Sequence, residues 1–138
     1  MKPRYQFLAA AIANTLILVT GSAFAAPPMV EIVAMPHPPV KMALAPLRTW
    51  LATQGGKLKV VETDVESPQG EKRLQSVGLA GHVPIVILID GQFRQKRKDG
   101  AAMEFVNFPA IDGAPVGVRG TWTTADVQAV LTERMKQP

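Results

Sequence analysis

Apolar residues along this chain change from the spacing of a strand to the spacing of a helix soon after residue 34. The run from Val30 to Ala34 is rich in β-branched side chains, which is typical of a strand. Beyond it, apolar residues recur every three or four positions until Gly55-Gly56, which predicts a helix with one buried face. The residues on that face are Val40, Ala43, Leu44, Leu47, Trp50 and Leu51.

Two further helices are predicted from their start signals. Ser67 suits the N-cap and Pro68 the first helical position, and Gly78 is a stop signal for this helix. Thr123 and Asp126 have the spacing of a capping box, in which two side chains satisfy the free N–H groups at a helix start. The chain is therefore predicted to form a third helix after residue 123.

The remaining strands are marked by apolar runs and by turn residues. Residues 57–64 alternate well enough for a second strand, and residues 85–89 are apolar at every position, which predicts a strand buried on both faces. Asp90-Gly91 and Asp99-Gly100 are two-residue turn signals. These turns are expected to lead into strands at 92–97 and 102–107, followed by a Pro/Gly-rich loop at 108–121.

Residues 1–25 have the features of a targeting segment. Lys2 and Arg4 precede an apolar stretch at 7–19, and Ala23-Phe24-Ala25 is a small-x-small cleavage signal. The apolar stretch is shorter than the about 20 residues of a spanning helix. We expect cleavage after Ala25, which leaves residues 26–138 as one periplasmic or secreted domain with no stable membrane span; retention as an anchor is the alternative.

Charge and cysteine content exclude several classes of function. The chain has 15 Lys and Arg, 11 Asp and Glu and no cysteine. Without Lys2 and Arg4 the surplus of cations falls to two, which is no argument for nucleic-acid binding. Thiol–disulfide exchange needs a thiolate, so oxidoreductase activity of that kind is excluded. Ser67 and Ser76, the serines of the predicted domain, lie in no G-x-S-x-G elbow, and we expect no enzyme activity.

The loop after the first strand resembles the active-site loop of the thioredoxin superfamily. In that family a C-x-x-C motif begins the first long helix, and Lys-Met and a kinking proline follow. Here both cysteines are absent from the corresponding slot. The residues that carry the resemblance are His37-Pro38-Pro39-Val40 in the slot, Lys41-Met42, Pro46, Val83-Pro84 at the place of the family's cis-proline, and Gly120 with Thr123 before the last helix.

The resemblance implies an α/β fold, a thioredoxin-like three-layer sandwich with a central mixed sheet flanked by helices and an extended C-terminal hairpin and loop. It also implies a cis bond between Val83 and Pro84. Two features depart from the family: Pro46 lies one residue late, and the segment 92–121 is longer than usual. Glu31 lies where the family often buries an acid, although it suits an exposed strand position equally well.

Thioredoxin-like proteins receive extended polypeptide in the groove beside the cis-proline, where a backbone edge pairs with it as an added strand. By that resemblance we expect a cysteine-free, non-catalytic binding or accessory module for a peptide or protein partner in the cell envelope. The expected contacts are His37, Pro38, Pro39, Val83 and Pro84, with Phe105 and Phe108 as a second patch. The alternative for these two phenylalanines is that they fold back over the sheet.

Copper binding is the alternative function. Imidazole and thioether groups suit Cu(I) or Cu(II), and an exported protein can meet copper. The candidate ligands are His37, His82, Met35 and Met42. The structural interpretation of the same residues is that methionine fills gaps in the core and that His82 makes a hydrogen bond beside the turn. No other cofactor is expected.

Residues 94–98 contain four cations in five positions. On a predicted edge strand, charged side chains can prevent pairing with another molecule. The functional alternative is a contact for an acidic partner or an anionic lipid surface. A short basic run without stacking aromatic residues is a poor footprint for nucleic acid.

Overall fold

The computed structural model describes residues 25–138, so all of the expected targeting segment except Ala25 lies outside the described residues. Among the described residues, no helix combines the length and apolar composition needed to cross a membrane. The elements are β1 (Met29–Ala34), α1 (Pro38–Gln54), the 3₁₀ turn η1 (Gly55–Lys57), β2 (Lys59–Asp64), α2 (Pro68–Ser76), β3 (Ile85–Ile89), β4 (Arg94–Lys96), β5 (Ala102–Glu104) and α3 (Thr124–Met135).

The central sheet is mixed and has the order β2-β1-β3. β1 pairs with β2 in parallel, with Val30 opposite Val60, and with β3 antiparallel, with Ile32 opposite Ile87. A parallel pair needs a crossover, which α1 supplies. β1 therefore lies in the middle of the sheet, and its central residue Ile32 is almost fully buried.

Residues 105–107 continue the sheet beyond β3. The Ile87 N–H donates to the Phe105 carbonyl at 2.9 Å, and the Asn107 N–H donates to the Ile85 carbonyl at 2.8 Å. β3 thus has neighbours along both edges, and all five of its residues are buried. This confirms the prediction that its uninterrupted apolar run forms an interior strand.

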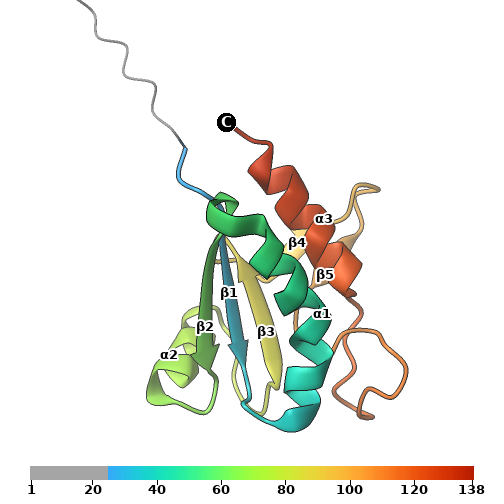
Figure 1. Cartoon of the computed structure of the whole chain (residues 1–138). Helices are drawn as coiled ribbons and strands as arrows, with labels where there is room; N and C mark the ends of the chain where they lie inside the picture. The colour runs from blue at the N-terminus through green and yellow to red at the C-terminus, as the bar shows by residue number, and fades with distance from the viewer. Residues whose placement is uncertain (1–24) are drawn as a thin grey trace, which may run out of the picture.

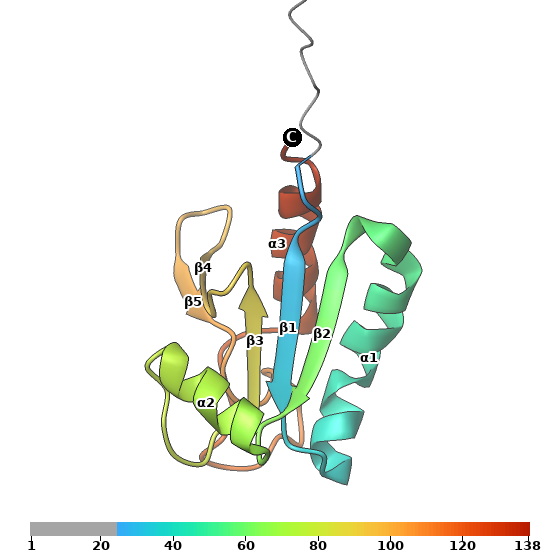
Figure 2. The same cartoon turned by 90° about the vertical axis from the view of Figure 1, so that its left-hand side faces the viewer.

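The helices cover both faces of the sheet. α1 and α3 lie side by side on one face and α2 lies on the other (Figures 1 and 2). The predicted stripe on α1 is confirmed, because five of its six residues are buried and Trp50 packs partly against them. The protein is therefore an α/β protein with helices on both sides of a mixed sheet.

The predicted helix starts are confirmed. The Gly70 N–H of α2 donates to the Ser67 hydroxyl at 3.1 Å. At α3, the Asp126 N–H donates to the Thr123 hydroxyl at 3.2 Å, and the Thr123 N–H donates to the Asp126 carboxylate at 2.8 Å. This reciprocal pair is a complete capping box.

The predicted hairpin at Asp90-Gly91 is only partly correct. Both residues have positive φ, 49° and 82°, and Ile89 and Gln92 exchange two backbone hydrogen bonds across the turn. Pairing stops there, however, because the edge of β3 is already occupied by residues 105–107. β4 instead pairs antiparallel with β5, and this short hairpin projects beyond the end of β3 (Figure 2).

Candidate functional site

Three segments that are distant in sequence meet where β1 ends. The Met35 N–H donates to the Pro84 carbonyl at 2.9 Å, which joins the end of β1 to the segment before β3. The Val65 N–H donates to the Ala34 carbonyl at 3.1 Å, which adds the end of β2. The loop from Met35 to α1 therefore shares one rim with the segment around Pro84.

His37 occupies the N-cap position of α1 without capping the helix. Its Nε2 atom lies 2.9 Å from Oε1 of Glu66, and both side chains are about half exposed. Asp64 Oδ1 accepts from the Glu66 N–H at 2.8 Å and so fixes the backbone of that residue. Pro38 and Pro39 begin the helix and carry no N–H, so this helix start offers few donors to an anion.

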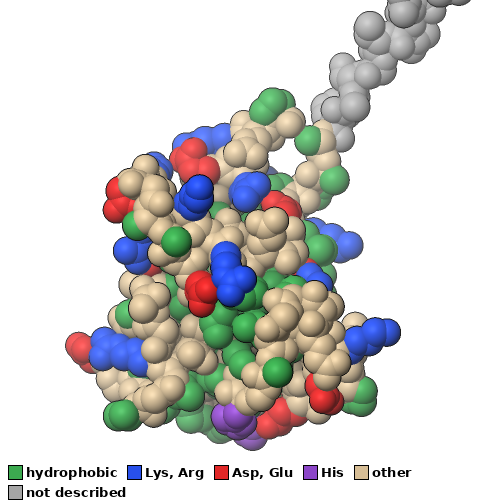
Figure 3. Space-filling model, turned by 180° about the vertical axis from the view of Figure 1, so that it is seen from behind, with side chains coloured by type: hydrophobic (Ala, Val, Ile, Leu, Met, Phe, Trp, Pro, Cys, Tyr) green, Lys and Arg blue, Asp and Glu red, His purple; other side chains and the backbone are tan. Residues whose placement is uncertain are grey.

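A groove of about 330 Å³ lies between this rim and α2. Its apolar part is formed by side chains from the end of β1, from α2 and from the segment before Pro84, and its polar part contains two glutamates and one histidine. The lining residues are Met35, Val65, Glu66, Glu71, Leu74, Gln75, Leu79, Ala80, Gly81, His82 and Val83. On this side of the molecule, hydrophobic side chains are visible in a furrow above histidine at the lower end (Figure 3).

The structure corrects the expected geometry at Pro84. No cis peptide bond occurs in residues 25–138, so the bond between Val83 and Pro84 is trans, the form favoured by about 0.5–1 kcal/mol in X-Pro bonds. The Val83 N–H donates to the Gly81 carbonyl at 3.1 Å, which closes a three-residue turn centred on His82. This N–H is therefore engaged within the turn, and Pro84 itself is buried.

The structure also overturns the expected second patch. Phe105 is fully buried, and Phe108 is 5% exposed. The Phe105 ring packs edge-to-face against Trp122 at a centroid distance of 6.0 Å, and the Trp122 indole donates to the Val106 and Asn107 carbonyls. These phenylalanines are core residues and are not available to a partner, because residues 105–107 form an interior part of the sheet.

The four candidate copper ligands are not all at one place. Met35 and His82 line the groove, and His37 is linked to it through Glu66. Met42 is 75% exposed on α1 and is not a lining residue. Among residues 25–138, no group of three or more His, Asp or Glu side chains is arranged to hold a metal ion.

The sequence analysis did not identify Glu66, Glu71, Leu74 or Leu79 as site residues. A usable signal existed for Glu66, because it follows the end of a parallel strand, where α/β proteins place functional groups. Leu74 carried no such signal, since a leucine in a helix is expected to be core, and Leu79 lies in the segment after α2, which carried no motif. Their exposure to the groove depends on how α2 is placed against the sheet.

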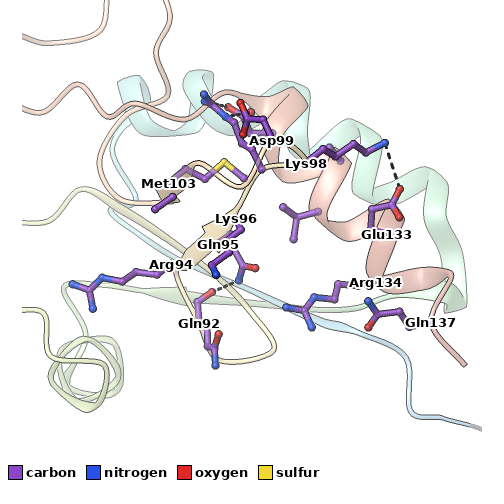
Figure 4. A pocket seen from close by; sticks show the side chains of 15 residues that line it. Gln92, Arg94, Gln95, Lys96, Lys98, Asp99, Met103, Glu133, Arg134 and Gln137 are labelled. Carbon is purple, nitrogen blue, oxygen red and sulfur yellow. Dashed lines mark hydrogen bonds and ion pairs between the residues drawn. The ribbon is translucent and has the colours of Figure 1, made fainter.

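A second and larger cleft, of about 940 Å³, lies between the β4–β5 hairpin and α3. Two ion pairs cross it, from Arg97 to Asp126 at 3.1 Å and from Lys98 to Glu133 at 3.6 Å (Figure 4). Burial alone raises the pKa of Asp126, but hydrogen bonds from Arg97 and Thr123 outweigh it, and this pKa lies below its usual value. The pKa of Glu133 is also lowered, first by its hydrogen bond from Lys136 and then by nearby Lys98.

Fold and site together define an α/β protein with a groove at one end of a mixed sheet and a cationic cleft beside its last helix. No family model matches this chain, and comparison with curated proteins and with solved structures finds no significant match.

Proposed function

We propose that this chain is an exported, thioredoxin-like protein without redox chemistry, and that its groove binds an extended segment of a partner protein in the cell envelope. The order of strands and helices, with a mixed sheet between α1 and α2, supports this kinship. The absence of cysteine removes thiol chemistry, and we attribute binding rather than catalysis to the groove.

One observation carries the proposal: the hydrogen bond from the Met35 N–H to the Pro84 carbonyl. It holds the His37-Pro38-Pro39 slot beside the segment that precedes β3. Thioredoxin-like proteins bind polypeptide between these two segments, and here a groove opens next to them. The slot prolines do not line the groove, but they are exposed and rigid, so they can contact the bound segment beyond it without losing conformational entropy.

The groove also indicates what the segment contains. Its volume of about 330 Å³ is at the lower end of the about 300–1,000 Å³ range of ligand pockets, which suits one or two side chains better than a whole ligand of drug size. Leu74, Leu79 and Val83 favour an apolar side chain, and Glu66 with Glu71 favours a neighbouring lysine or arginine. The engaged Val83 N–H argues for side-chain recognition in place of strand addition at this site.

The test is selection from a library of linear seven-residue peptides on residues 26–138. We expect the selected peptides to place an apolar residue beside Lys or Arg. Double replacement Glu66→Lys with Glu71→Lys should abolish this selection, whereas Asp112→Lys, at an exposed position of the 108–121 loop, should not. Selection of the same peptides by all three proteins, or of none by the wild type, would overturn the proposal.

Copper binding is a second candidate, favoured by the presence of Met35 and His82 in one groove. Titration of metal-free protein with Cu(I) against a competing chelator tests it. Affinity that is lost in His37→Ala with His82→Ala supports a copper site. Affinity weaker than about micromolar, or unchanged in that double variant, rejects it.

A further inference from the structure

Within residues 25–138, β4 pairs with β5 alone, so one of its backbone edges is free. The Phe105 N–H donates to the Phe93 carbonyl and the Arg97 N–H to the Ala101 carbonyl, each at 2.9 Å, so alternate residues of this strand direct their backbone groups toward β5. Arg94 and Lys96 lie between these positions and opposite Glu104 and Ala102, where an antiparallel ladder has no hydrogen bonds. Their N–H and C=O groups therefore point away from β5.

This edge borders the cleft beside α3. Gln92 and every residue from Arg94 to Lys98 line the cleft. Successive side chains of a strand point to opposite faces, so a cleft lined by all of them reaches around an edge of the hairpin, and Arg94 and Lys96 are exposed there. The free N–H and C=O groups of Arg94 and Lys96 are thus accessible from the cleft.

The two faces of β4 differ in character. Gln95 and Met103 are 7% and 5% exposed and lie on the side that faces α3, where Val130 is partly buried (Figure 4). Arg94 and Lys96 are exposed on the other face, and Figure 4 shows Arg94 pointing away from α3. A strand added at this edge would meet Gln95 and the partly exposed Val130 on one face and cations on the other.

The charges of the cleft favour an acidic occupant. Five cations and three acids line it. Three of the cations are already paired: Arg94 with Glu104, Arg97 with Asp126 and Lys98 with Glu133. Lys96 and Arg134 have no ion-pair partner within residues 25–138. Figure 4 shows Arg134 reaching from α3 toward β4. The other lining acid is Asp99, at the hairpin turn, so cations prevail along the strand edge.

We propose that the β4 edge binds an extended segment of another protein, with alternating acidic and apolar residues, as an added antiparallel or parallel strand. Its carboxylates face Lys96, beside the pair that Arg94 makes with Glu104, and its apolar side chains cover the partly exposed Val130. This site is separate from the groove beside Pro84, which favours a basic segment, and it stands or falls independently of the function proposed there. Nucleic acid is disfavoured, because the nearest aromatic ring, Phe93, is 5% exposed and cannot stack on a base.

Fluorescence anisotropy with a labelled eight-residue peptide of alternating glutamate and valine tests this inference. We expect saturable binding to residues 26–138 that weakens as salt rises, and at least about tenfold weaker binding of a lysine–valine peptide. Lys96→Glu should lower the affinity for the glutamate–valine peptide by about tenfold or more and improve binding of the lysine–valine peptide. Lys72→Glu, an exposed cation on α2, should leave both unchanged.

A second probe separates strand addition from charge attraction alone. The same glutamate–valine peptide, N-methylated at alternate residues so that one edge cannot donate hydrogen bonds, should lose binding. Equal binding of the methylated and unmethylated peptides overturns the inference, as does an unchanged affinity in Lys96→Glu. Binding to phosphatidylglycerol vesicles in the absence of peptide binding also overturns it and assigns the cations to a lipid surface.

Discussion

Arg73 on α2 donates two hydrogen bonds to the carboxylate of Glu31 on β1, from Nε to Oε2 at 2.9 Å and from Nη2 to Oε1 at 2.5 Å. The Glu31 side chain is 13% exposed, so the bidentate pair joins the helix to the sheet where the carboxylate is largely shielded from water. An acid at this place in the chain had two interpretations, a buried acid or an exposed strand residue. The structure shows the first, with its charge compensated by Arg73.

Arg73→Met should therefore lower the free energy of unfolding by about 1–3 kcal/mol, because it leaves the Glu31 carboxylate without its partner. Arg94→Met is the matched control. Arg94 pairs with Glu104 at 2.8 Å, but these side chains are 72% and 53% exposed, so about 0–1 kcal/mol is expected. Urea denaturation at pH 7 measures the free energy of unfolding of both variants. Equal losses in the two would contradict the conclusion that burial makes the Arg73–Glu31 pair the stronger one.

Gly70→Ala should destabilise the protein although Gly70 lies within α2. Alanine is favoured over glycine in a helix interior by about 1 kcal/mol. Here a Cβ atom would overlap the Asp64 carbonyl and approach the Val65 Cα to 2.7 Å, and both of these are backbone atoms that cannot rotate away. A net loss of about 1–3 kcal/mol is expected from overpacking.

Gly56→Ala is the control for this substitution. A Cβ atom at Gly56 would have no other atom within 4 Å, and its φ is not positive. Thermal unfolding should show an unchanged or slightly higher melting temperature for Gly56→Ala and a lower one for Gly70→Ala. A stabilised Gly70→Ala protein would mean that α2 does not pack against the end of β2 as described.

Asp126→Asn should produce a pH-dependent loss of stability. The lowered pKa of Asp126 means that its ionised form stabilises the folded state above the unfolded pKa of about 3.9, and that this contribution disappears as the pH falls through the folded value. At pH 7 the substitution should cost about 1–2 kcal/mol, since it weakens the capping box and the bond from Arg97. The difference between the denaturation curves of the two proteins should shrink as the pH falls below the unfolded pKa of about 3.9.

A constant difference between Asp126→Asn and wild type from pH 7 to pH 3 would exclude charge as the cause. Thr123→Ala serves as the comparison, because it removes the hydroxyl that accepts from the Asp126 N–H and keeps the carboxylate. Its cost should be about 0.5–2 kcal/mol and should depend less on pH.

Phe105→Ala should cost about 3–5 kcal/mol, since the ring is fully buried against Trp122. Val116→Ala should cost almost nothing, because the Val116 side chain is fully exposed in the 108–121 loop. Chemical denaturation measures the free energy of unfolding of both variants. A Phe105→Ala protein as stable as the wild type would mean that the Phe105 ring is not buried, and it would support the earlier expectation that Phe105 contacts a partner at the surface.

The local features of the fold follow from short stretches of the chain. Caps at Ser67 and Thr123, the buried stripe of α1 and the interior character of β3 were all predicted, because each depends on residues only a few positions apart. Composition alone excluded thiol chemistry, since that chemistry needs an atom that the chain lacks.

Which segments meet depends on long-range packing. A strand edge accepts one partner, and residues 105–107 pair with the free edge of β3. The predicted hairpin at Asp90-Gly91 therefore cannot extend, and Phe105 becomes part of the core. β4 pairs with β5 instead and keeps one open edge. The trans bond before Pro84 and the glutamates of the groove likewise follow from how distant segments pack together. Such packing depends on contacts between residues far apart in the chain, which local patterns do not specify.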